Sequence, residues 1–195
     1  MVDATTTPGA GGTDDYAFLS VRELGRMLRA GETTPLRLAE YFLDRLDTVG
    51  RRFNAVVTLT RERALEEARA AERELASGHD RGPLHGIPYG AKDLLATAGG
   101  IPTTWGAVPF RNQQFDRDAT VVERLRAAGA VLVAKVAMVE LAGGFGYEQP
   151  NASLTGPGLN PWDPNAWSGG SSSGSGCSSA CGCGSACCVA SFSAI

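Results

Sequence analysis

Long apolar runs, an excess of one charge and a signal peptide are all missing from this sequence. No run approaches the ~18 consecutive apolar residues that a membrane-spanning helix needs, which argues against a membrane partner. Lysine and arginine together number 18 and aspartate and glutamate 21, and this balance argues against a nucleic-acid partner. The N-terminus, MVDATTTPGAGGTDD, lacks the basic and apolar regions of a secretory signal. We therefore expect a cytoplasmic protein that binds a small molecule.

Cysteine is missing from residues 1–176 and then occurs five times between Cys177 and Cys188. Its spacing there, C-x3-C-x-C-x3-C-C, differs from the C-x2-C pairs of common zinc sites, so we expect neither a metal nor a cofactor. A disulfide-bonded tail is also not expected in a cytoplasmic chain. The change of composition after Gly176 indicates that residues 177–195 are an aberrant tail rich in cysteine, serine and alanine.

Helical and strand patterns alternate along most of the chain and predict an α/β fold, with a sheet covered by helices. After a disordered leader, residues 1–18, Ser20 and Glu23 form a capping box. Thr34-Pro35 is typical of the start of a second helix, so a helical hairpin comes first. The further elements predicted from periodicity are a strand at 54–59, a helix at 60–77, a buried strand at 87–95, a helix at 119–128 and an apolar strand at 130–134.

Lys92 stands near the end of the predicted strand 87–95. Burial of a lysine disfavours its charged form and lowers its pKa, and a neutral amine can act as a general base. Asp93 follows directly, and because adjacent strand residues point to opposite faces it need not pair with Lys92. The alternative interpretation is a solvated lysine at a strand end.

A stretch of serine and glycine at 168–176 follows an irregular, glycine- and proline-rich segment at 143–168, which is typical of a functional loop. The glycines permit unusual backbone conformations, and the serine hydroxyls can relay protons. A flexible linker is the alternative. A phosphate-binding loop is disfavoured because no lysine follows the last glycine. A Ser-His-Asp triad is disfavoured too, although 170–174 reads Gly-x-Ser-x-Gly, because both histidines lie upstream and 165–167 is not predicted as a strand.

Three motifs follow one another along the chain: Gly82 to Pro88 leading to Lys92-Asp93, Leu154-Thr155-Gly156 with Asn160 to Asp163, and Ser168 to Ser172. The amidase signature family has these motifs in the same order, so residues 19–176 resemble the N-terminal part of that family's domain. The resemblance implies the family's mixed β-sheet, flanked by helices, with a helical hairpin at its N-terminus.

The same resemblance implies a chemistry, the hydrolysis of a C–N amide bond by a Ser-Ser-Lys triad through an acyl-enzyme. Lys92 would be the base and Ser171 the middle serine, which follows a cis peptide bond. Ser172, Gly169 and Gly170 would support them. The substrate would be a small-molecule amide, and a complete family member would form either a homodimer or a complex with amidotransferase partner subunits.

The family's nucleophilic serine follows the middle serine at a distance that here falls on Ile195, the last residue. No alanine-rich helix of the family is recognisable after Gly176, and no nucleophile is found. We therefore expect the 195-residue chain to be inactive, with a change of reading frame near Gly176 as the cause and a genuine cysteine-rich tail as the rival explanation. Two alternatives to a general amidase stay open: glutamine hydrolysis, as in the A subunit of the amidotransferases, and a non-catalytic fragment or interaction module.

Overall fold

A three-stranded sheet forms the centre of the computed structural model, which describes residues 16–143 and 148–183. Its strands, in spatial order, are β1 (Val56–Leu59), β3 (Val131–Val136) and β2 (Pro88–Lys92). The central strand β3 pairs antiparallel with β1 and parallel with β2. The predicted mixed sheet is therefore confirmed. Every residue of β2 and β3 is buried, as the apolar run in β3 predicts.

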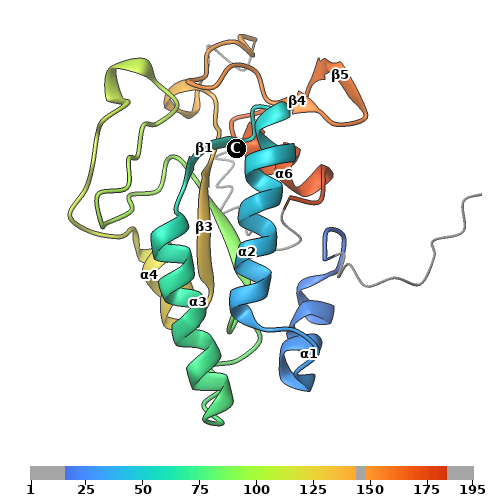
Figure 1. Cartoon of the computed structure of the whole chain (residues 1–195). Helices are drawn as coiled ribbons and strands as arrows, with labels where there is room; N and C mark the ends of the chain where they lie inside the picture. The colour runs from blue at the N-terminus through green and yellow to red at the C-terminus, as the bar shows by residue number, and fades with distance from the viewer. Residues whose placement is uncertain (1–15, 144–147, 184–195) are drawn as a thin grey trace, which may run out of the picture.

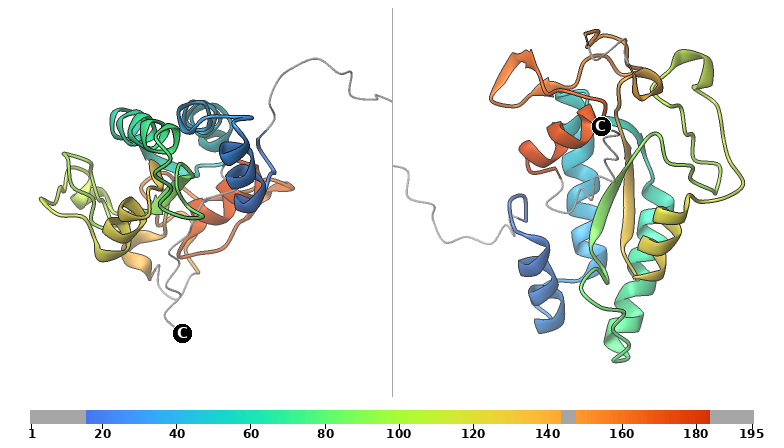
Figure 2. Two further views of the ribbon diagram at one scale, coloured as in Figure 1. Left: turned by 90° about the horizontal axis from the view of Figure 1, so that it is seen from below. Right: turned by 180° about the vertical axis from the view of Figure 1, so that it is seen from behind.

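Helices cover both faces of this sheet (Figure 1, Figure 2). On one face, α2 (Pro35–Arg45) and α3 (Arg61–Ala76) pack alanines and leucines against the valines of β3. On the other face, Leu125 of α4 (Thr120–Ala127) packs against a cluster that includes Tyr89 and Leu132. None of the helices within the described ranges is both long and apolar enough to cross a membrane.

The N-terminal helical hairpin forms as its local signals predict. Ser20 caps α1 (Val21–Ala30) in a reciprocal capping box with Glu23, and Thr34 caps α2. The expected leader differs from the structure at its end, because Tyr16 is buried and its hydroxyl accepts a hydrogen bond from Thr33. Residues 1–15 of that leader lie outside the described residues.

A two-stranded hairpin corrects the prediction that 143–168 is irregular and that 165–167 is no strand. Strand β4 (Leu159–Asn160) pairs antiparallel with β5 (Asp163–Trp167). Asparagine and proline are poor strand formers, which hid the hairpin from the sequence pattern. The Asn160 side chain accepts a hydrogen bond from the Trp162 amide at 3.0 Å, and this local turn brings the strands together. Residues 144–147 of the predicted loop lie outside the described residues.

Helix α6 (Ser173–Ala180) also corrects the sequence prediction, since it begins inside the serine-glycine stretch and continues past Gly176. Cys177 is buried in the cluster formed by α2, α3 and β3, and its thiol donates to the Leu159 carbonyl at 3.1 Å. Tertiary packing overrides the low helix propensity of glycine and serine here. The change of composition at Gly176 is thus not a break in secondary structure. Three short helical turns complete the described elements: η1 (Leu46–Gly50), η2 (Val108–Phe110) and η3 (Glu140–Ala142).

Candidate active site

Lys92 and Ser171, predicted to meet, lie in direct contact. The Lys92 Nζ atom donates a hydrogen bond to Ser171 Oγ at 2.7 Å. Lys92 is 1% exposed and Ser171 9% exposed, so the contact is closed to bulk water. The structure contradicts two alternative interpretations of the sequence. The lysine is not solvated at a strand end, and the serine-glycine stretch is not a flexible linker.

Two backbone hydrogen bonds hold the serine stretch against the segment that follows β3. The Val139 amide donates to the Ser171 carbonyl, and the Gly174 amide donates to the Ala137 carbonyl, both at 2.9 Å. Because β2 and β3 run parallel, their carboxyl ends lie at the same edge of the sheet, where Lys92 ends β2. The docked stretch therefore places Ser171 beside Lys92.

Gly174 is a point of close backbone contact between α6 and this segment. A Cβ atom at Gly174 would overlap the backbone of Ala137 and of Ala55. We expect Gly174→Ala to lower the free energy of unfolding by about 3 kcal/mol, because rigid backbone on two sides cannot move away. Urea denaturation followed by tryptophan fluorescence measures the change.

A matched control lies two residues further along the same helix. A Cβ at Gly176 would meet only the Ser168 carbonyl oxygen, at an ordinary 3.6 Å. Gly176→Ala should therefore be neutral or stabilise by up to about 1 kcal/mol, through the higher helix propensity of alanine. Equal destabilisation by the two substitutions would show that α6 does not dock as described.

Burial lowers the pKa of the Lys92 amine. Desolvation penalises the ammonium form but not the neutral amine, so a larger fraction of Lys92 is able to accept a proton at neutral pH than for a solvated lysine. A neutral amine hydrogen-bonded to a serine hydroxyl is the arrangement that a general base requires.

The other residues predicted for the site surround this contact. The peptide bond between Gly170 and Ser171 is cis. Gly169 has a φ of 85°, which favours glycine, and a Cβ at Gly170 would contact the side chains of Val139 and Trp167. Ser172 is half-buried and stands at the N-cap of α6, where its carbonyl accepts from the Gly176 amide at 3.2 Å.

An ion pair next to the site was missed by the sequence analysis. Asp93 and Lys135 are both fully buried, with Lys135 Nζ 3.4 Å from Asp93 Oδ1. Thr104 donates to Asp93 from its amide at 3.0 Å and also from its hydroxyl. One signal was available: Lys92 and Lys135 are the only lysines in the sequence. A lone lysine at the end of an apolar run needs a buried partner.

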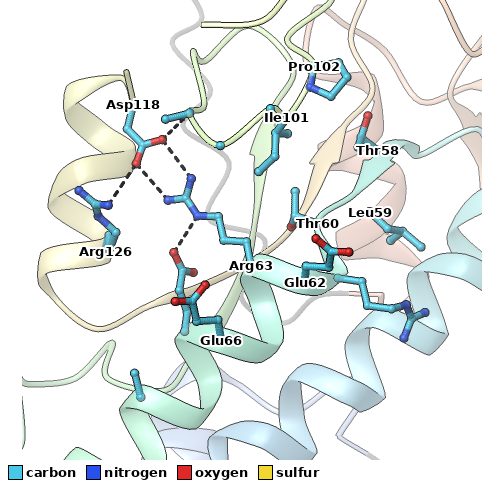
Figure 3. A pocket seen from close by; sticks show the side chains of 16 residues that line it. Thr58, Leu59, Thr60, Glu62, Arg63, Glu66, Ile101, Pro102, Asp118 and Arg126 are labelled. Carbon is cyan, nitrogen blue, oxygen red and sulfur yellow. Dashed lines mark hydrogen bonds and ion pairs between the residues drawn. The ribbon is translucent and has the colours of Figure 1, made fainter. Parts of the chain in front are cut away.

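A groove of about 840 Å³ lies elsewhere, between the start of α3, loop 98–102 and Asp118 (Figure 3). Neither Lys92 nor Ser171 lines it. Its central cation, Arg63, donates to both carboxylate oxygens of Asp118 at 3.0 Å and to Glu67 at 2.8 Å. These hydrogen bonds raise the Arg63 pKa although burial opposes its charge. Arg63, Asp118 and Glu67 thus satisfy one another, and the groove lies apart from the Lys92–Ser171 contact.

Comparison with known proteins identifies the class of protein to which the chain belongs. The fold is that of the amidase signature enzymes: the peptide amidase of Stenotrophomonas maltophilia superposes with a TM-score of 0.77 at 36% identity, over 84% of this chain and 34% of that enzyme. The Amidase family model matches residues 37–187, and the chain belongs to this family. The match extends beyond Gly176.

Curated relatives agree with this assignment. AmiD of Mycobacterium tuberculosis, a protein that carries the name amidase, is 41% identical over 177 residues, which are 90% of this chain and 36% of AmiD. The A subunit of the glutamyl-tRNA(Gln) amidotransferase of Thermobifida fusca is 40% identical over 157 residues, 80% of this chain and 31% of that relative. The chain spans about a third of the length of the curated relatives it matches.

Proposed function

We propose that this chain supplies the base and the middle serine of an amidase that hydrolyses a C–N amide bond through a Ser-Ser-Lys triad. Lys92 accepts, through Ser171, the proton of a nucleophilic serine, which attacks the amide carbonyl. An acyl-enzyme forms, the amine leaves with a proton, and water then releases the acid. Ser172, Gly169 and Gly170 support Ser171 and its backbone.

The observation that carries this proposal is the buried 2.7 Å hydrogen bond between Lys92 Nζ and Ser171 Oγ. Burial of the ammonium form of a lysine costs free energy, so a lysine excluded from water calls for an explanation. Its hydrogen bond to a hydroxyl provides a path for a proton, whereas a purely apolar contact would not. The membership of the family supports the same reaction class.

The substrate proposed is a small-molecule amide, and the compartment proposed is the cytoplasm. A second candidate is the hydrolysis of glutamine within a larger complex, which the similarity to the amidotransferase A subunit favours. Co-purification separates these candidates, because a component of an amidotransferase requires partner subunits and a general amidase does not. The third candidate, a non-catalytic interaction module, predicts a cooperative thermal transition without any amide turnover.

We also propose that the cysteine-rich segment 177–195, which helix α6 and the family match both enter, arises from a change of reading frame after the domain region 19–176. The support is the restriction of all five cysteines to this segment. Sequencing the coding DNA for several hundred bases beyond the codon for Gly176 tests this. Another frame that encodes amidase-like sequence is the expected result, and the lack of one in every frame would contradict the proposal.

The polypeptide of 195 residues is expected to show no turnover of simple amides, since no serine has been assigned as its nucleophile. A longer polypeptide, continued in the recovered frame, is expected to release ammonia or amine from them. Product release is measured under identical conditions for the two polypeptides. Equal turnover by both would show that the triad proposed here is not the catalytic machinery.

A further inference from the structure

Strand register separates the two lysines of the chain onto opposite faces of the sheet. Ala91 of β2 pairs with Lys135 of β3, and Lys92 pairs with Val136. Because side chains alternate along a strand, Asp93 shares the face of Ala91 and therefore of Lys135. Lys92 projects from the other face, toward Ser171.

A bulge in β3 produces this arrangement. Tyr89 pairs with Leu132, but the next residue, Gly90, pairs with Ala134, so Val133 is an extra residue in β3. Without the extra residue, the register would continue one position earlier and Lys92 would pair with Lys135. A shift of one residue moves every following side chain to the other face. The bulge thus brings Lys135 to Asp93 instead of to Lys92.

Two hydrogen bonds and one ion pair hold the Lys135 ammonium group. It donates to the Leu95 carbonyl at 2.7 Å and to the Thr103 hydroxyl at 2.8 Å, and it lies 3.4 Å from Asp93 Oδ1, an oxygen that makes no hydrogen bond of its own among the described residues. Burial lowers the pKa of Lys135 to about 8 and raises that of Asp93, and the attraction between the two charges opposes both shifts. The other charges that act on Lys135 are those of Asp118 and Arg63, which pair with each other.

We propose that Lys135 is a positioning residue for the base: it binds the Asp93 carboxylate on the face away from Lys92 and neutralises its charge there, which leaves Ser171 as the partner of the Lys92 amine. This inference rests on the proposed function, in which Lys92 is the proton acceptor. An unpaired carboxylate one residue from Lys92 would favour the ammonium form of that lysine, and an ammonium group cannot accept a proton.

The two lysines allow a direct test in the full 195-residue chain. With lysine labelled with ¹⁵N at Nζ, Lys92 and Lys135 give the only two lysine side-chain signals, and Lys135→Met assigns them. The Lys92 signal is titrated with pH in the wild type, in Lys135→Met, in Asp93→Asn and in the double variant. We expect Lys135→Met to raise the Lys92 pKa by about one unit, Asp93→Asn to lower it by about one unit, and the double variant to return it to the wild-type value.

The opposite signs distinguish this role from packing alone. A loss of packing would admit water in both single variants and raise the Lys92 pKa in each. Shifts of equal sign, or no shift, would overturn the inference. Should Lys135→Met fail to fold, Asp93→Asn decides alone, since it keeps the Leu95 and Thr103 contacts: a lower Lys92 pKa supports the inference and an equal or higher one refutes it. A wild-type Lys92 that titrates like a solvated lysine would refute the proposed base itself.

Discussion

Lys92→Met is expected to lower kcat/KM for amide hydrolysis by about 10²–10⁴-fold in the longer polypeptide that carries the nucleophile, which is the range for loss of a general base. Methionine keeps an unbranched apolar stem like that of lysine but has no amine to accept a proton. Ser171→Ala is expected to have an effect of the same order, because it removes the hydroxyl through which Lys92 acts. Steady-state kinetics with a simple amide measures both.

The pH dependence of kcat/KM in the wild type is an independent test of Lys92 as the base. In the proposed mechanism the neutral amine is the active form, so kcat/KM should rise with pH through the Lys92 pKa and then level off. Because burial lowers that pKa, the midpoint of the rise lies below 10.5, the pKa of an ordinary lysine. The control is Arg69→Met, which removes an exposed cation from α3 and should leave kcat/KM unchanged. Wild-type kinetics in Lys92→Met would contradict the assignment of the base.

Asp118→Ala is expected to lower the free energy of unfolding by about 3 kcal/mol, at the lower end for a broken buried ion pair because the groove in Figure 3 admits water. The substitution leaves Arg63, 17% exposed in its side chain, without the two hydrogen bonds that Asp118 accepts. It also removes the acceptor of the Ala98 amide, at 2.8 Å. Thermal and urea unfolding measure the loss.

An exposed ion pair provides the matched control. Arg26 and Glu32 lie 2.5 Å apart, but their side chains are 61% and 45% exposed. Water screens such a pair, so Glu32→Gln should lower the free energy of unfolding far less than Asp118→Ala does. If the two substitutions lowered the free energy of unfolding equally, the Arg63–Asp118 pair would not hold α3 in place as the structure indicates.

Local signals made the first part of the fold predictable. The capping box of Ser20 fixes one helix start through contacts three residues apart, and Pro35 favours the next through its restricted backbone angle. Such local effects need no knowledge of the rest of the chain. The meeting of Lys92 and Ser171 is different, because 79 positions separate them. Periodicity contains no information on such a contact, and it was predictable only through the resemblance to a family.

The features that were missed all depend on tertiary structure. Helix α6 has poor intrinsic propensity and forms because Gly174 permits close packing against the chain after β3. Lys135 escaped notice because the apolar pattern ended at Ala134 and because the bulge at Val133 is not visible in the alternation of side chains. A charged residue at the end of an apolar strand, with no second lysine nearby in sequence, was the signal that would have revealed it.

The most direct test of the account is the separation of Lys92 Nζ and Ser171 Oγ in a high-resolution crystal structure of the chain. We expect a hydrogen bond of 2.7 Å, with residues 168–172 docked beside the end of β2. A separation beyond ~3.5 Å, with this stretch away from the sheet, would contradict it.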